Sequence, residues 1–249
     1  MIMASRFIVV LIFISLFHCL SCTSTKKIAY FENAQDSAFR AVLGTIEAPI
    51  QKNDILNITI SSLSPTADVE YNRSDNDVKG YLVNGDGNIQ LPKLGNVAAA
   101  GLTKKQLTES ITNIILEKKE LLNPIVEIRQ LNFEVTVLGE VTTPTVINVP
   151  SEQISLIKAL GLAGDLTIYG KRDNILLIRE EDGKRITRHL DINSADFLGS
   201  PYYYLKPNDV VYVEPNKAKI ATTDRTQQII PVVLSGISIL VLVLDRVIK

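Results

Sequence analysis

The sequence predicts an α+β fold of two small modules, and three observations indicate it. Short apolar segments recur with a period of two along the middle of the chain, as in half-buried strands. Turn residues at 84–87 and 182–183 separate pairs of such segments, as in β-hairpins. Helical spacing of apolar residues occurs at 102–122 and 154–163. The modules would join near residues 130–132.

The N-terminus has the pattern of a cleaved leader. Residues 7–17 are almost entirely apolar, which is the length of a signal-peptide core and short for a membrane span. The stretch ends at Ser21-Cys22, which resembles a lipobox, so we expect residues 1–21 to be removed and Cys22 to carry lipid. Residues 22–47 would be its tether. A plain secretory signal cleaved nearby is the alternative.

Residues 48–130 form the first expected module. Leu56, Ile58 and Ile60 alternate with polar residues and predict a strand, and residues 61–79 read as a loop. Segments 82–83 and 89–91 flank the Asn84–Gly87 turn, which we interpret as a structural hairpin. The helix of 102–122 follows, with Thr103 as N-cap and Gln106 completing a capping box. Asn123-Pro124 ends it, and a strand at 125–129 closes the module.

Residues 131–216 form the second expected module. Its expected elements, in order, are a strand at 133–138 that continues over 145–149, the helix at 154–163 with Gly164 as its C-cap, a hairpin of 175–178 and 186–192, and a last strand at 207–213. Asn53-Asp54 and Asn208-Asp209 precede comparable strands in the two modules. We interpret both as turn chemistry rather than as a repeat.

The C-terminal residues 225–249 predict a membrane helix. A helix over 227–245 would be about 28 Å long, close to the thickness of a hydrocarbon core. One stripe of it is polar or small, so in a ring of subunits it would face an aqueous lumen. The possible lumen-lining residues are Gln228, Ser235, Ser238 and Asp245. A bare single-span anchor and a tail packed on its own core are the alternatives.

The chain lacks the usual signs of catalysis. Its formal net charge is −1 and it has no basic stripe, so nucleic acid is not an expected partner. His189 and Asp191 read as solvated strand residues, and the acidic residues 180–182 read as a hairpin tip. Both cysteines, Cys19 and Cys22, lie in the leader, which excludes a disulfide in the body. No catalytic residue, metal site or cofactor is predicted, and the protein is not expected to be an enzyme.

Several motifs in order carry a family resemblance. The first module resembles the outer-membrane polysaccharide export family (Wza type) in residues 80–95, 52–56 and 123–126. The second resembles the soluble-ligand-binding β-grasp (SLBB) fold in residues 137–141, 144, 159–164, 177–179 and 207–213. Only one β-grasp module fits this chain.

The resemblance implies a homo-oligomeric ring in the bacterial outer membrane, with its body in the periplasm and its C-terminal helices in the membrane. A capsular or extracellular polysaccharide would pass through, with an inner-membrane polysaccharide co-polymerase as partner. A monomeric envelope sugar-binding lipoprotein is the alternative. Tyr202-Tyr203-Tyr204 supports that alternative, and the lack of Trp weakens it.

Overall fold

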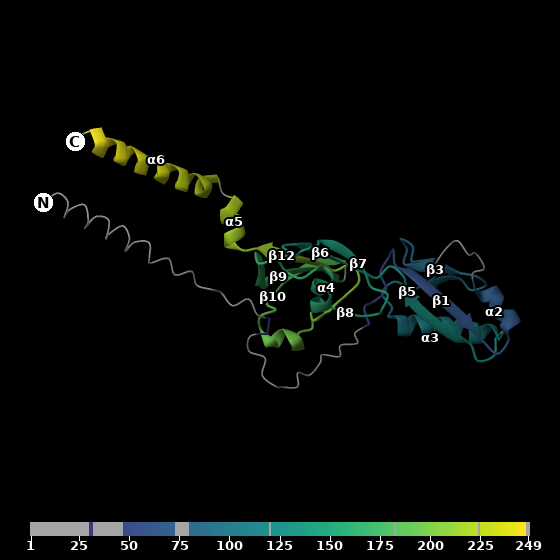
Figure 1. Ribbon diagram of the computed structural model, residues 1–249. Helices are drawn as coiled ribbons and strands as arrows, with labels where there is room; N and C mark the ends of the chain where they lie inside the picture. The colour runs from purple at the N-terminus through teal and green to yellow at the C-terminus, as the bar shows by residue number, and fades with distance from the viewer. Residues whose placement is uncertain are drawn as a thin grey trace.

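The computed structural model describes residues 30–31, 47–72, 80–119, 121–181, 183–223 and 225–247. Two separate hydrophobic clusters organise the body, one drawn from residues 50–128 and one from residues 133–213. Figure 1 shows the elements of the first cluster at one end of the body and those of the second beside them. The chain is thus built as two modules, each with its own core.

The first module is a three-stranded antiparallel sheet covered by a helix. The sheet has the order β2-β1-β5, formed by β1 (Ile55–Ser61), β2 (Tyr81–Leu82) and β5 (Ile125–Gln130). The predicted alternation in β1 is confirmed, because Leu56, Ile58 and Ile60 are buried while their neighbours are not. Helix α3 (Lys104–Lys118) buries three aliphatic residues of one face, Leu107, Ile111 and Ile115.

The predicted start of α3 is confirmed. The Gln106 amide donates to Thr103 Oγ1 at 3.2 Å, and the Thr103 amide donates to Gln106 Oε1 at 2.9 Å. Two amides of the open first turn are thereby satisfied. The helix ends at Lys119, whose φ of 56° is left-handed.

The predicted first hairpin is wrong in its pairing. Strand β2 pairs with β1, whereas β3 (Asn88–Leu91) pairs with β4 (Gly95–Ala98). The turn itself exists, because the Asn84 amide donates to the Asn88 carbonyl and Gly87 has φ 85°. The chain before the turn is held instead by Asp54, whose carbonyl accepts from the Val83 amide at 2.8 Å.

The expected loop at 61–79 contains a helix, α2 (Pro65–Tyr71). Proline stands in its first turn, where its fixed φ fits and no amide is missed. Tyr71 at the other end is only 1% exposed and joins the core of the module. This buried aromatic holds the helix together with Asp68, whose carboxylate accepts from the Ser62 amide at 2.9 Å and from the Ser62 hydroxyl at 2.5 Å.

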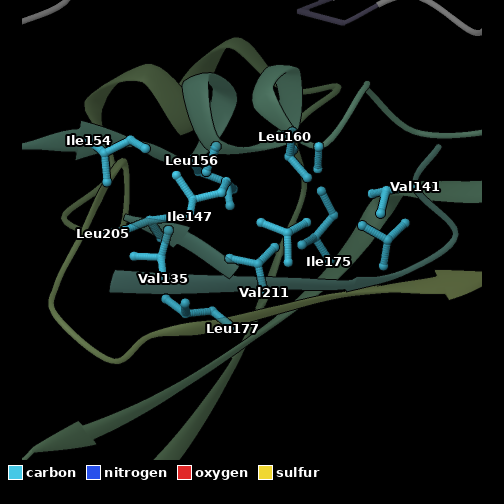
Figure 2. Packing of buried hydrophobic residues seen from close by; sticks show 14 of the residues in the cluster. Val135, Val141, Ile147, Ile154, Leu156, Leu160, Ile175, Leu177, Leu205 and Val211 are labelled. Atoms are coloured by element: carbon cyan, nitrogen blue, oxygen red, sulfur yellow. The ribbon is translucent and has the colours of Figure 1, made fainter. Parts of the chain in front are cut away.

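The second module is a five-stranded sheet with a helix on one face. The order is β10-β9-β12-β6-β7, formed by β6 (Glu134–Gly139), β7 (Thr145–Asn148), β9 (Gly170–Glu181), β10 (Lys184–Leu190) and β12 (Val210–Pro215). The central pair β12–β6 is parallel and the other pairs are antiparallel. Figure 2 shows Leu156 and Leu160 of α4 (Leu156–Leu162) above Val135, Ile147 and Val211 of the sheet.

The hairpin of β9 and β10 is confirmed, with Gly183 at φ 69° in its turn. The strand expected to continue over 133–149 instead folds back, so that β7 pairs antiparallel with β6. Gly139 ends β6 at φ 92°, and a Cβ there would lie 2.1 Å from the Val213 carbonyl oxygen. The short pair β8 (Ile154–Ser155) and β11 (Tyr204–Leu205) and the 3-10 helix η1 (Ala195–Gly199) complete the module.

Helices α5 (Lys217–Thr223) and α6 (Arg225–Val247) follow the second module, and α6 extends away from it in Figure 1. Between residues 229 and 244, the described aliphatic side chains of α6 are exposed. The predicted fold class, α+β with a C-terminal transmembrane helix, is wrong, because the described residues form a mixed α/β fold without such a span.

Among the residues that the structure describes, no helix is both long and apolar enough to cross a membrane. The reason lies in the ends of α6. Its uncharged apolar stretch, residues 229–244, is about 24 Å long as a helix, short of a hydrocarbon core of about 30 Å. Counting Gln227, Gln228 and Asp245 toward the span overestimated its length. The expected lumen-facing side of the helix depended on that span.

Candidate functional site

The two modules share one turn with a buried acid. Asn53 and Asn208 have φ of 72° and 65°, and the following residues Asp54 and Asp209 are 3% and 0% exposed. Each carboxylate accepts the amide three residues earlier, from Gln51 at 2.8 Å and from Lys206 at 2.7 Å. The shared Asn-Asp pattern is therefore a turn that is stabilised by a hydrogen bond between its own Asp carboxylate and a backbone amide three residues earlier.

In the second module the buried acid binds a buried arginine. Arg179 of β9 is 3% exposed, and its Nε lies 2.9 Å from Asp209 Oδ1 while its Nη2 lies 2.7 Å from Asp209 Oδ2. The same Nη2 donates to the Tyr204 carbonyl at 3.2 Å. Burial raises the pKa of Asp209, and the guanidinium beside it lowers that pKa in part. Both side chains of this ion pair are buried, so they are not exposed for contact with a ligand in solution.

In the first module the equivalent acid has no cation beside it. Burial raises the pKa of Asp54, and the Gln51 amide and then the Gln130 side chain lower that pKa only in part. Gln130 belongs to β5 and pairs with Leu56 of β1. An amide thus occupies the place that Arg179 takes in the second module. Neither acid has the partners of a proton-transfer pair.

Charged side chains continue from the buried pair to the surface. Lys206 Nζ lies 2.7 Å from Glu181 Oε1, and the hydrogen bond from Lys206 lowers the pKa of Glu181. Arg188 Nε donates to the Tyr202 hydroxyl at 2.9 Å. The guanidinium carbons of Arg179 and Arg188 lie 5.5 and 6.0 Å from the centre of the Tyr202 ring.

The tyrosine cluster is packed. Tyr202 is engaged by two arginines, as described above. Tyr203 meets Tyr204 edge-on at 5.0 Å between ring centres, and meets Phe197 at 5.7 Å. Tyr202 and Tyr203 also pack against the core of the second module. These contacts favour a structural role over the stacking platform that a sugar-binding protein would need.

His189 is exposed on β10, opposite Leu176 of β9. Asp191 does not join it, because its Oδ1 accepts from the Asn193 amide at 2.9 Å. Within the described part of the chain, no three His, Cys, Asp or Glu side chains gather closely enough to hold a metal ion.

The structure does not bring the predicted site residues together. Cys22 and the side chains of Gln228 and Asp245 lie outside the described residues. Ser235 and Ser238 are exposed, and their hydroxyls donate to the carbonyls of Val232 at 2.8 Å and Leu234 at 2.9 Å. Both hydroxyls are therefore satisfied within their own helix.

Sequence reasoning missed the Arg179–Asp209 pair, although a signal for it was present. Ile175 and Leu177 mark the inward face of β9, and Arg179 is the next residue of that face. An arginine in a buried register position requires an acid, because an unpaired charge there is costly.

The comparisons with known proteins agree with this two-module order. The family model described as polysaccharide biosynthesis/export protein matches residues 46–131, and the SLBB domain model matches residues 135–188. The EPS I polysaccharide export outer membrane protein EpsA of Ralstonia solanacearum is 28% identical over 143 residues, which is 56% of this chain and 37% of that protein. Its namesake in Ralstonia nicotianae is 30% identical over 141 residues, which is 55% of this chain and 36% of that protein.

This chain thus spans little more than a third of the length of these relatives. The two matched domains each correspond to one of the two cores described above. The chain belongs to the outer-membrane polysaccharide export family of the Wza type, whose members are transport proteins and not enzymes.

Proposed function

We propose that this protein is a subunit of an outer-membrane channel that exports capsular or extracellular polysaccharide. The observation that carries the proposal is the order of the two modules, an export domain followed by an SLBB domain, each folded around its own core. The relatives named as polysaccharide export outer membrane proteins add support. In this role copies of the chain form a ring, and the polysaccharide moves through its centre.

The buried charges of the body fit a transport protein. The Arg179–Asp209 pair and the two Asn-Asp turns stabilise their modules. The cited hydrogen bonds of these groups are made to residues of the same module. Movement of a polymer through a channel requires no bond-breaking group. The driving force for this movement would come from a partner, an inner-membrane polysaccharide co-polymerase. The body lies in the periplasm, tied to the outer membrane by lipid on Cys22.

The mass of the full-length protein in detergent tests the ring. A ring predicts a symmetric particle of several copies of the 27.5 kDa chain. A monomer under the same conditions contradicts the ring and favours the sugar-binding lipoprotein. Deletion of the gene should abolish surface polysaccharide and leave the polymer inside the cell, and the wild-type copy should restore export. Unchanged surface polysaccharide contradicts the export function.

Metabolic labelling with a fatty-acid analogue tests the anchor. The wild type should take up the label and Cys22→Ser should not, because that thiol is the acceptor. Cys19→Ser is the matched control and should label like the wild type. Equal labelling of all three proteins would exclude lipid on Cys22.

A further inference from the structure

Two residues near the N-terminus contact the second module. The Tyr30 hydroxyl donates to Asp165 Oδ1, and the Phe31 amide donates to the Ile192 carbonyl at 3.4 Å. Both rings pack against the hydrophobic core of that module and lie 6.2 Å apart. Burial, together with the Asp165 carboxylate, raises the pKa of Tyr30 to about 12. The hydroxyl is thus held in its neutral, donating form.

The surface that receives these residues is fixed by the module itself. Asp165 has φ 66° and accepts the Leu166 amide on its Oδ1 at 2.7 Å, while its carbonyl accepts the Thr142 amide at 2.9 Å. The Ile192 amide donates to the Arg172 carbonyl at 3.0 Å. Hydrogen bonds that do not involve Tyr30 or Phe31 therefore already hold the four segments of this surface in place.

Arg172 adds a second kind of contact. Its guanidinium carbon lies 5.6 Å from the centre of the Tyr30 ring, within the range of a cation–π interaction. Its Nε is buried and has no hydrogen-bond partner. The aromatic ring is thus the contact available to this buried part of the cation.

The chain is held again further on, by the first module. Glu47 Oε2 accepts the Lys105 amide at 3.1 Å, and the Ile50 amide donates to the Leu102 carbonyl at 2.9 Å. Ile50 is only 4% exposed. Among the residues that the structure describes, the first point after Tyr30 and Phe31 at which the body holds the chain is Glu47.

We propose that Tyr30-Phe31 is a docking element, and that Asp165, Arg172 and Ile192 form its binding site on the second module. The part of the proposal that concerns the membrane rests on the proposed lipid at Cys22. The chain from Cys22 to Tyr30 extends at most about 26–29 Å, whereas from Cys22 to Glu47 it extends about 83–90 Å. Docking therefore shortens the free chain between the lipid anchor and the folded body about threefold. It also makes the second module, rather than the first, the module nearest to the anchor along the chain.

Chymotrypsin digestion of the purified full-length protein tests the docking. The enzyme cuts after Tyr30 or Phe31 only when these residues leave the module, and cleavage after Phe39 provides an internal reference. Tyr30→Phe removes the hydroxyl and keeps the ring, and Asp165→Gly removes the acceptor at a left-handed position that glycine tolerates. Each should raise the summed cleavage after residues 30 and 31, relative to cleavage after Phe39, about fivefold or more.

Tyr169→Phe is the matched control. It removes a hydroxyl from the same module, at a ring that lies under Lys219 rather than at the docking site. It should leave the cleavage ratio unchanged. An unchanged ratio in both Tyr30→Phe and Asp165→Gly, or an equal rise in Tyr169→Phe, would overturn the proposal.

Spacers test the consequence at the membrane. A twelve-residue Gly-Ser insert spans about 17–21 Å on average. Placed after Thr25, it should lower energy transfer from a fluorophore on Asp173→Cys to a dye in phospholipid vesicles. Placed after Gln35, it should leave the transfer unchanged, because Tyr30-Phe31 still holds the chain. Equal effects of the two spacers would overturn the docking proposal.

The two proposals fail in different ways. If Cys22→Ser binds the vesicles as well as the parent protein, the anchor is wrong, and the chymotrypsin ratios alone decide the docking. If the anchor holds and the ratios do not change, the docking is wrong and the proposed export function stands.

Discussion

Replacing Arg179 with methionine should unfold the second module more readily than any surface substitution. Methionine fills similar space but leaves Asp209 buried with only the Lys206 amide as a partner. The change removes two charge-assisted bonds to Asp209, at 2.9 and 2.7 Å, and one bond to the Tyr204 carbonyl. Bonds of the first kind are worth about 1.5–3 kcal/mol each, and loss of one partner of a buried pair costs about 3–5 kcal/mol.

Differential scanning calorimetry of the full-length protein in detergent measures the effect. A loss of 3–5 kcal/mol should lower the melting temperature by about 6–20 °C for a chain of this size. Lys171→Met is the matched control, because it breaks the Lys171–Glu214 pair, which has the same 2.7 Å distance but side chains 33% and 27% exposed. That half-exposed pair should contribute no more than about 1 kcal/mol.

A second variant separates the lost charge from lost packing. Adding Asp209→Asn to Arg179→Met removes the unpaired charge and keeps an oxygen for the Lys206 amide. The double variant should therefore melt above Arg179→Met alone. If Arg179→Met and Lys171→Met lower the melting temperature equally, or if the double variant melts lower still, the reasoning from the buried charge is wrong.

Three further predictions concern single contacts. Gly87→Ala should lower the free energy of unfolding in urea by about 1 kcal/mol or more, because φ is 85° there and a Cβ would lie 2.9 Å from the Ala100 Cβ. Gly85→Ala is the control and should lower it by less than about 0.5 kcal/mol, because its Cβ would have no neighbour within 4 Å. Thr103→Ala should cost about 1 kcal/mol through loss of the α3 cap, with Thr103→Ser close to wild type. Since the pKa of Tyr30 is raised from 10.0 to about 12, its docking should be complete below pH 10 and lost as pH rises through 12. Ultraviolet titration of wild type minus Tyr30→Phe should show one late-ionising tyrosine, and a difference curve centred at pH 10 would contradict this.

The elements that the sequence predicted well carry their pattern locally. The alternation in β1, the capping box of α3 and the Gly183 hairpin each lie within a few consecutive residues. The pairing of β2 was mispredicted because its partner β1 lies far back in the chain and competes with the nearby β3. A turn motif shows where the chain reverses, but it does not show which strand is then the neighbour.

The contacts of the candidate site depend even more on distant residues. The hydrogen bond between Tyr30 and Asp165 joins residues that are 135 positions apart, and no motif near Tyr30 predicts its partner. Arg179 could have been flagged from its inward register, but the identity of its acid required the sheet order. The C-terminal helix was misjudged for another reason, because polar residues at its ends were counted toward the length of the membrane span.

The parallel pairing of β6 with β12 has a consequence for the order of folding. The first strand and the last strand of the second module are neighbours in the middle of the sheet, where Thr136 lies opposite Val210. Such a contact closes a long loop, which makes it slow and late. A chain growing from its N-terminus can complete the first module early, but the second has a gap at its centre until residue 213 is available. Premature termination anywhere in β9 or β10 would therefore leave an open, apolar half-sheet, the kind of intermediate that aggregates.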